Sequence, residues 1–375
     1  MKVLHLFSNA KWTGPAEPAL NLCVALRRAG VEADFACAPN AGAAVNKVVA
    51  TARDRGLEPI LEFHLSKHAH PIKNALDKLA LARFLKRRPY DVLHCHLDND
   101  HQIGLTAARK LGVPLVRSSY YGEGFPETAR HRKLLAGTAF LIEPSKRAME
   151  RDEMEFGFPC ERMRVVPGAV DLERFDPMRE VPDARSWLGI PPRAFVVGIV
   201  ARLQTHRHYE DFFQAVRKLV DREPNTRAIV VGRGTKQAEV GKQPVVALGL
   251  QEHVHFPGFV EGEEYVGMLK AFDAFVFLVP GSDGTCRAVR EAMAMAKPVV
   301  AADRGMLREI VDDGETGFIC DGSPESLSRA LHRLATNLQL ARALGRAARA
   351  KALREFSLDS QAGTVKEIYQ RLVNK

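Results

Sequence analysis

The sequence lacks the long apolar run that a membrane-spanning helix requires. Its strongest run, residues 274–279, has the length of a strand, whereas a span takes about 18 residues or more. The first seven residues contain a lysine and a histidine and lack the apolar core of a secretory leader. We therefore expect a cytoplasmic protein that crosses no membrane.

Cysteines are few, and none of the six forms a CxxC pair or stands with closely spaced histidines at metal-binding distance in the sequence. This scatter predicts reduced, mostly buried thiols. His94 and His96 would share one face of a strand, but no third ligand stands beside them at metal spacing. We therefore predict that the protein holds no metal.

Acidic residues are outnumbered by basic ones, 45 to 54, which gives a formal net charge of +9. Such an excess suits an anionic partner, such as nucleotide phosphates or an acidic lipid surface. The only compact basic run is Lys86–Arg88, and a solvated surface is the simpler interpretation of that run. No basic stripe is interleaved with aromatic residues, so nucleic acid is not an expected partner.

Short β-branched runs alternate with helical segments along the whole chain, which is typical of an α/β fold built on parallel sheets. The 375 residues exceed what one core usually supports, so we expect two Rossmann-like domains facing across a cleft. Residues 1–175 would form an N-terminal acceptor domain, joined by a C-terminal helix at 360–375, and residues 176–356 a donor-binding domain. The expected strands are 2–7, 33–38, 91–96, 115–118, 140–142 and 164–166, then 195–200, 227–231, 253–256, 274–279, 298–301 and 317–320.

The stretch 280–300 carries the most chemistry. A strand ends at residue 279, a glycine-containing loop holds Asp283, and a helix is expected over 285–296. The first amides of that helix, from Thr285 to Ala288, would bind a phosphate group. Asp283 precedes the helix and Glu291 lies two turns into it, so one carboxylate can reach a sugar and the other a ribose. Alternatively, Glu291 pairs only with Arg287 on the helix surface.

This stretch resembles the pattern E-G-F-G-x-x-x-x-E-A-M-A-x-G-x-P-V-V-A of the retaining glycosyltransferases of family four, which have the GT-B fold. The resemblance implies that Glu291 holds the ribose hydroxyls of a nucleotide-sugar donor and that Asp283 contacts the transferred sugar. Asp283 stands where the family usually has Glu, and Thr285-Cys286 replace Phe-Gly. The donor-binding residues implied in this stretch are Gly284, Thr285, Cys286, Arg287 and Glu291.

Further motifs extend the resemblance along the chain. Residues 200–208 resemble G-R-L-x-x-x-K-G, which implies that Arg202 and Arg207 clamp the diphosphate and stabilise the leaving group. Taken alone, both arginines would be read as solvent-facing. The resemblance also assigns Gly14 to a phosphate loop, Tyr120 to the place of a sugar-contacting histidine, Gly232 to a strand end, and Phe259 and Val260 to a base-binding turn.

The resemblance thus implies a retaining hexosyltransferase that uses a nucleotide diphosphate sugar and needs no metal or other cofactor. Its acceptor would be a glycan or lipid-linked glycan, in cell-surface polysaccharide or lipopolysaccharide biosynthesis. Lys86–Arg88 and Arg130–Lys133 would allow peripheral contact with the anionic inner face of the cell membrane. A catalytically impaired nucleotide-sugar-binding homologue and a nucleotide-sugar epimerase remain as alternatives. A nicotinamide-dependent enzyme is disfavoured, because no strand is followed by GxGxxG.

Overall fold

The computed structural model describes residues 1–39, 46–279 and 286–374, and these form two compact units. Unit 1 contains the described residues of Met1–Ala169 together with the C-terminal segment from Leu358 onward. Unit 2 contains those between Val170 and Ser357. The sequence placed the boundary near residue 175, but Phe175 packs with Val170 in the core of unit 2, which moves the boundary toward the N-terminus.

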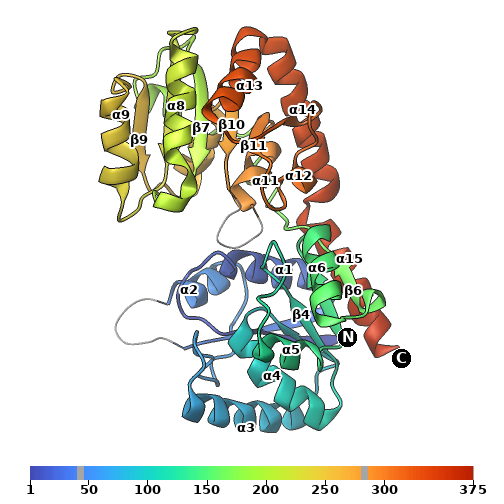
Figure 1. Ribbon diagram of the computed structural model, residues 1–375. Coiled ribbons are helices and arrows are strands. Elements are labelled where there is room, and N and C mark those ends of the chain that lie inside the picture. Colours follow the sequence, from blue (N-terminus) through green and yellow to red (C-terminus); the bar gives the residue numbers. More distant parts are fainter. Residues whose placement is uncertain (40–45, 280–285, 375) are drawn as a thin grey trace. The chain divides into compact units, whose positions relative to one another are not determined.

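Unit 1 is built on a parallel sheet with the strand order β2-β1-β3-β4-β5-β6 (Figure 1). Its strands are β1 (Lys2–Phe7), β2 (Glu32–Cys37), β3 (Val92–Cys95), β4 (Leu115–Ser118), β5 (Phe140–Glu143) and β6 (Met163–Val165). The central strands β1, β3 and β4 are buried on both faces, although they contain the polar residues His5, His94 and Arg117 among their apolar ones.

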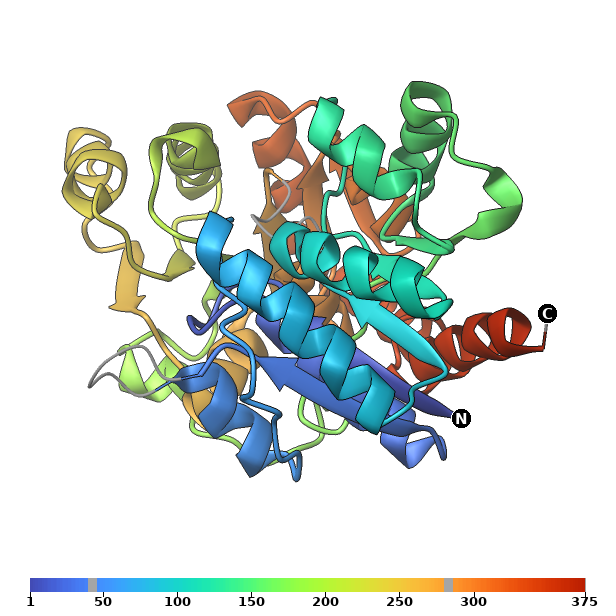
Figure 2. The same cartoon turned by 90° about the horizontal axis from the view of Figure 1, so that it is seen from below.

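Helices cover both faces of this sheet. They are α1 (Ala16–Arg28), α2 (Lys47–Asp54), α3 (Pro71–Arg87), α4 (Asp98–Leu111), α5 (Ala129–Leu135), α6 (Lys146–Phe156) and α15 (Leu358–Val373). Val3 and Phe7 of β1 pack with α1 and α15 on one face, while Leu4 and Leu6 pack with α3 and α4 on the other. Helix α15, red in Figures 1 and 2, therefore belongs to unit 1 although it ends the chain.

Unit 2 repeats this plan with the strand order β12-β11-β10-β7-β8-β9. Its strands are β7 (Phe195–Val200), β8 (Thr226–Val231), β9 (Val254–Gly258), β10 (Ala274–Phe277), β11 (Val299–Ala302) and β12 (Gly317–Cys320). Its helices are α7 (Ala184–Trp187), α8 (Tyr209–Val220), α9 (Gln243–Ala247), α10 (Gly262–Ala271), α11 (Arg287–Ala294), α12 (Leu307–Ile310), α13 (Pro324–Thr336) and α14 (Leu338–Glu355).

The strand order of unit 2 reverses between β7 and β10, and that of unit 1 reverses between β1 and β3. Ligands of such sheets bind beyond the carboxyl ends of the strands at these crossing points. The α/β fold of two Rossmann-like units is thus confirmed, and every expected strand is present with small shifts at its ends. Across the described residues, no helix combines the length and apolar character that a membrane-spanning helix needs.

Candidate active site

The loop after β7 carries both predicted arginines. Arg202 follows the strand directly and is exposed, whereas Arg207 ends a short 3-10 turn and is only 6% exposed. The hydroxyl of Tyr209, the first residue of α8, donates to the carbonyl oxygen of Ala201 at 2.9 Å. This bond joins the start of the loop to the helix that follows it, so the loop holding the two cations is fixed at both ends.

Two glycines after β8 let the β7 loop lie against it. A Cβ atom on Gly232 would stand 2.1 Å from the carbonyl oxygen of Ala201, and one on Gly234 would stand 2.0 Å from that of Leu203. Gly232 also has a φ of 142°, which side chains with a Cβ rarely adopt. Only glycine fits at these positions, and the predicted role of Gly232 as a strand-end residue agrees with this close approach.

An exposed aromatic ring follows β9 in the same unit. Phe259 is 54% exposed, and the guanidinium of Arg233 lies 4.9 Å from the centre of its ring. Val260 beside it is buried in the core. The backbone amide of Gly232 donates to the carbonyl oxygen of Gly258 at 2.8 Å, so the ends of β8 and β9 are held together under the ring. A flat, half-exposed ring with a cation on one face suits stacking with a base.

Helix α11 begins later than the sequence predicted. Its first residue is Arg287, and its N-cap is Cys286, which is buried and has left-handed backbone angles of φ 49° and ψ 43°. Because that conformation is not helical, the positive end of the helix dipole lies at residues 286–288. Asp283, Gly284 and Thr285 lie outside the described residues.

Glu291 projects from the second turn of α11 and is 4% exposed. Its Oε1 lies 3.2 Å from Nε of Arg287, so the helix-surface pairing considered from sequence is present. Its Oε2 accepts a hydrogen bond of 2.5 Å from the hydroxyl of Tyr265 in α10. Burial, followed by the negative charge of Glu291, raises the pKa of Tyr265 well above its usual value, so this phenol stays a donor. A buried carboxylate held from two sides is fixed in direction, unlike a solvated surface acid.

The crossing point of unit 2 therefore combines charges of both signs. The loop after β7 supplies Arg202 and Arg207, and the helix after β10 supplies its positive end and Glu291, while β7 and β10 are hydrogen-bonded neighbours. Guanidinium groups and a helix N-terminus attract a diphosphate, and a fixed carboxylate accepts hydrogen bonds from a pair of hydroxyls.

Unit 1 places its two predicted residues at the carboxyl ends of its strands. Gly14 lies in the turn directly before α1, after β1. Tyr120 follows β4 and is partly buried, and its hydroxyl lies 2.8 Å from Nδ1 of His96. Tyr120 is thus connected to the buried part of the sheet by a side-chain hydrogen bond.

Three imidazoles gather at the β1/β3 crossing point, which the sequence did not predict because His5 lies 89 positions before His94. His5, His94 and His96 are fully buried, with one nitrogen of each within 4.8 Å of the others. Their rings are near parallel, with interplanar angles of 34°, 19° and 15°. A metal lies in the plane of every imidazole that binds it, about 2.0–2.1 Å from the nitrogen. Two ligand atoms at that distance in a tetrahedral site stand about 3.3 Å apart. Nδ1 of His5 and Nε2 of His96 lie 2.9 Å apart, so these two nitrogens are placed for a hydrogen bond.

Two family models match the chain. Residues 13–174 match the model described as Glycosyltransferase Family 4, and residues 181–351 match Glycosyl transferases group 1. The chain belongs to this glycosyltransferase family. The D-inositol 3-phosphate glycosyltransferase of Streptomyces griseus is 30% identical over 319 residues, covering 75% of this chain and 66% of that protein. The match thus spans just under two thirds of the length of that relative.

Solved structures, among them a glycosyltransferase, share the fold. One from Rickettsia africae has a TM-score of 0.84 at 16% identity, covering 99% of this chain and 98% of the other. Anabaena HepE in complex with UDP and glucose has a TM-score of 0.77 at 21% identity, covering 98% of each chain. The expected GT-B architecture is therefore confirmed for this glycosyltransferase.

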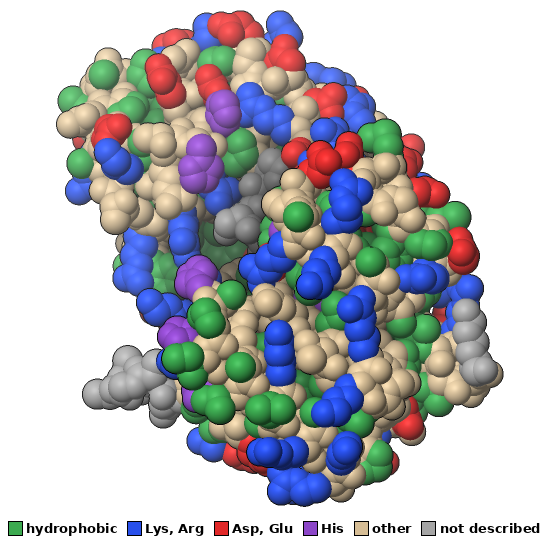
Figure 3. Space-filling model, turned by 60° about the horizontal axis from the view of Figure 1, so that its bottom comes forward, with side chains coloured by type: hydrophobic (Ala, Val, Ile, Leu, Met, Phe, Trp, Pro, Cys, Tyr) green, Lys and Arg blue, Asp and Glu red, His purple; other side chains and the backbone are tan. Residues whose placement is uncertain are grey.

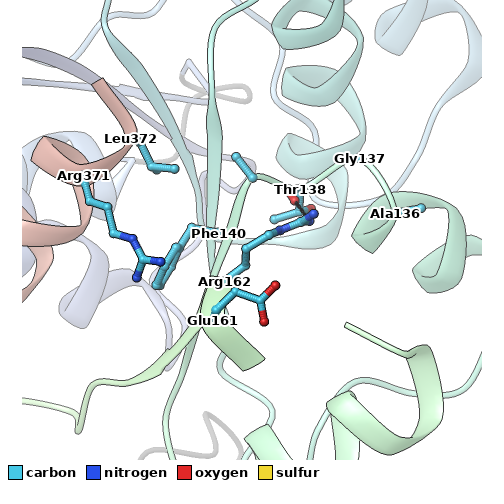
Figure 4. Close-up of a pocket in the computed structure, with 9 residues that line it drawn as sticks. Ala136, Gly137, Thr138, Phe140, Glu161, Arg162, Arg371 and Leu372 are labelled. Carbon is cyan, nitrogen blue, oxygen red and sulfur yellow. Dashed lines mark hydrogen bonds between the residues drawn. The ribbon is translucent and has the colours of Figure 1, made fainter. Parts of the chain in front are cut away.

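A cavity in unit 1 lies away from these residues. It has a volume of about 320 Å³ and opens at the amino ends of β5 and β6 in unit 1 (Figure 4). Arg162 extends toward Thr138, whose carbonyl oxygen accepts from it, and Arg371 of α15 points toward Phe140. This is the opposite end of the sheet from Tyr120, so the cavity is separate from the candidate site.

Two residues that shape the site were missed from sequence. Tyr265 lies in α10, where the apolar periodicity of the helix gives no sign of a functional side chain. Only its hydrogen bond to Glu291 shows that its hydroxyl belongs to the site. His5 gave a weak signal as a histidine within the first strand. Its contact with His96 depends on strand pairing, which periodicity does not reveal.

Proposed function

We propose that the protein transfers a hexosyl-type sugar from a nucleoside diphosphate sugar to a glycan or lipid-linked acceptor, with retention at the anomeric carbon and without a metal. The observation that carries this proposal is that Arg202, Arg207 and Glu291 all lie on segments that follow β7 and β10, the two neighbouring strands at the crossing point of unit 2. Membership of the glycosyltransferase family and the ribose-binding role implied for Glu291 support it.

The mechanism follows from the charges. Arg202, Arg207 and the positive end of α11 stabilise the negative charge that develops on the diphosphate as the bond to the sugar breaks. Glu291, fixed by Tyr265, accepts hydrogen bonds from the two ribose hydroxyls and orients the donor. The acceptor hydroxyl then attacks from the face that the diphosphate leaves and gives its proton to the departing phosphate oxygen. The configuration at the anomeric carbon is thereby retained. Asp283 and Tyr120 would contact the sugar.

A donor screen tests the proposal. Thermal unfolding is followed with uridine, guanosine and adenosine diphosphate sugars, because a ligand that binds the folded state raises its apparent stability. Release of nucleoside diphosphate is then measured with glycan, lipid-linked and phosphorylated polyol acceptors, with and without EDTA. We expect one donor class to stabilise the protein and to be turned over in EDTA, with the anomeric configuration kept.

Other outcomes identify the alternatives. Binding of a donor without turnover on any acceptor would indicate a non-catalytic homologue. Conversion of the donor sugar to its epimer without transfer would indicate an epimerase, and inversion of configuration would refute retention. A phosphorylated polyol belongs in the panel because the Streptomyces griseus relative is named for inositol 3-phosphate.

The proposal of a lipid-linked acceptor is supported by the exposed surface of α3. This helix exposes Ile72, Leu76 and Leu79, which are 69%, 51% and 52% exposed. Its C-terminal end carries Lys86 and Arg87, both exposed. Figure 3 shows basic and hydrophobic side chains interspersed over one face of the molecule. Apolar side chains beside cations suit the surface of an anionic membrane, where a lipid-linked acceptor for cell-surface polysaccharide or lipopolysaccharide would lie.

Vesicle flotation tests this contact. We expect the protein to float with vesicles containing anionic phosphatidylglycerol and to lose this association in Leu76→Glu. Leu338→Glu, at a leucine of α14 in unit 2 that is 53% exposed, serves as the matched control and should float like the wild type. Absence of flotation with both anionic and uncharged phosphatidylcholine vesicles, or equal loss in both variants, would refute membrane contact through α3.

A further inference from the structure

A chain of side-chain hydrogen bonds runs from the buried sheet of unit 1 to Tyr120. Nδ1 of His5 lies 2.9 Å from Nε2 of His96, and Nδ1 of His96 lies 2.8 Å from the Tyr120 hydroxyl. His5 and His96 are fully buried, while Tyr120 is partly exposed. The chain thus connects the interior with the end of the sheet where ligands bind.

The imidazoles of this chain are neutral. Burial lowers the pKa of His5 to about 3. Burial, then the neighbouring His5 and Arg117, lowers the pKa of His96 well below its usual value. A neutral imidazole carries one N–H donor and one nitrogen acceptor. Each hydrogen bond of the chain therefore has one donor and one acceptor. Because His96 donates at one nitrogen and accepts at the other, both of its hydrogen bonds run the same way, either toward His5 or toward Tyr120.

The buried end of the chain decides between the two directions. Nε2 of His5 has no hydrogen-bond partner among the described residues. In the inward direction, the Tyr120 hydroxyl would donate to Nδ1 of His96, and Nε2 of His96 would donate to Nδ1 of His5. The proton of His5 itself would then lie on Nε2 as a buried, unsatisfied N–H. If the chain runs outward, Nε2 of His5 carries only a lone pair. Buried unsatisfied N–H groups are rarer and costlier than unsatisfied acceptors, so the outward direction is favoured.

We propose that His5 and His96 are positioning residues that make Tyr120 a hydrogen-bond donor to a sugar hydroxyl oxygen. His5 donates from Nδ1 to His96, and His96 donates from its own Nδ1 to the Tyr120 oxygen. The Tyr120 oxygen thereby acts as an acceptor toward His96, and its proton is directed away from the histidines. This inference rests on the proposed function, since the sugar is the ligand that Tyr120 would meet.

The surroundings of Tyr120 fit a small oxygen-bearing group. A hollow of about 30 Å³ lies beside it at the carboxyl ends of β4, β5 and β6, lined among others by Ser118, Pro144, Gly168 and Gln361. A water-sized group needs about 10–15 Å³ on this measure, so the hollow has room for a small oxygen-bearing group. His94 contributes to the cluster without joining the chain, because its nitrogens face the hydroxyls of Ser118 and Tyr369.

Ring nitrogen chemical shifts test the direction without any substrate. Protein labelled with ¹⁵N in its histidine rings is measured at pH 7.5, and His5→Asn and His96→Asn provide the assignments. We expect His5 and His96 both to carry their proton on Nδ1. A proton on Nε2 of His96 would overturn the proposal. Adding one equivalent of Zn²⁺ provides a second check, because binding of Zn²⁺ with loss of the ring N–H signals of His5 and His96 would also overturn it.

A double-mutant cycle tests the positioning role. His96→Asn should lower kcat/KM for transfer on the order of tenfold in the wild type and by less than about twofold in Tyr120→Phe. His94→Asn is the matched control, because His94 is equally buried and stacked on His96 but faces other partners. Its effect should be the same in both backgrounds.

The outcomes separate this inference from the proposed function. An equal effect of His96→Asn in both backgrounds would show that His96 acts through packing alone. If no donor is turned over, the proposed function fails, while the tautomer measurement still decides the direction of the chain. His96→Gln replaces His96→Asn if the latter does not fold.

Discussion

The two units share one architecture but place different chemistry at their crossing points. In unit 2 the point between β7 and β10 carries charged groups, with the cations Arg202 and Arg207 on the loop after β7 and the anion Glu291 on the helix after β10. In unit 1 the point between β1 and β3 carries neutral imidazoles, His5 among them, that are fully buried. The same backbone topology therefore serves to attract charge in one unit and to orient hydrogen bonds in the other.

This difference follows from how each group is compensated. In unit 2, Arg202 is exposed to solvent, and the buried Glu291 is held by Arg287 and Tyr265, so these groups can keep their charge. Buried imidazoles can stay only because they are neutral and hydrogen-bonded. We infer that unit 2 supplies most of the binding and leaving-group stabilisation, and that unit 1 supplies orientation. Substitutions should therefore differ in size and in kind between the two units.

The largest effect is expected from Arg207→Met. Removing one buried cation at the diphosphate site should lower kcat/KM by roughly 10² to 10³-fold, because its charge is matched to the departing phosphate. Steady-state release of nucleoside diphosphate measures this effect. Arg222→Met, an exposed arginine beyond the far end of α8, is the matched control and should retain wild-type kcat/KM. Equal activity of both variants would remove Arg207 from the mechanism.

Glu143→Gln should change stability with pH. Burial, then the negative charge of Asp152, raises the pKa of Glu143 well above its usual value of about 4.3. The folded state then holds a proton that the unfolded state has released. The free energy of unfolding of the wild type thus falls, by about 1.4 kcal/mol per pH unit, as pH rises from about 4.3 toward the folded-state pKa.

Glutamine does not titrate, so the stability advantage of the variant over the wild type should grow with pH. Urea unfolding followed by circular dichroism at pH 5, 6, 7 and 8 measures this difference. A constant difference between the two proteins over that range would show that Glu143 is ionised in the folded state.

Tyr265→Phe should lower kcat/KM about tenfold, because Glu291 loses the donor that fixes its direction. The aromatic ring is kept, so packing changes little. Tyr90→Phe in unit 1 is the matched control, since it removes a similar bond of 2.6 Å to the carboxylate of Asp34. Comparable losses in both variants would mean that the effect is one of stability and not of donor orientation.

Much of this molecule could be predicted from its sequence because its signals are local. Alternating strands and helices gave both sheets, and motif residues such as Arg202, Arg207 and Glu291 follow strand ends that periodicity locates. The predicted start of α11 was wrong by two residues, because Cys286 has a left-handed backbone that its residue type does not indicate.

Contacts between distant segments could not be predicted in this way. The bond from Tyr265 to Glu291 joins two helices across 26 positions, and that from His5 to His96 joins β1 to the residue after β3 across 91. Such pairs depend on strand order and register, which one sequence does not encode in any short motif. The charged site of unit 2 was therefore easier to predict than the histidine cluster of unit 1.

The smallest effect is expected from Phe259→Ala. If the base of the donor stacks on this ring, its removal weakens the ground state and the transition state alike, so KM for the donor should rise a few-fold, about threefold to tenfold, with kcat unchanged. Trp187→Ala is the matched control, because Trp187 is an aromatic residue of unit 2 that is 58% exposed and lies in α7, outside the site. A fall in kcat at constant KM would instead place Phe259 beside the reacting sugar, and the division between a binding unit and an orienting unit would no longer hold.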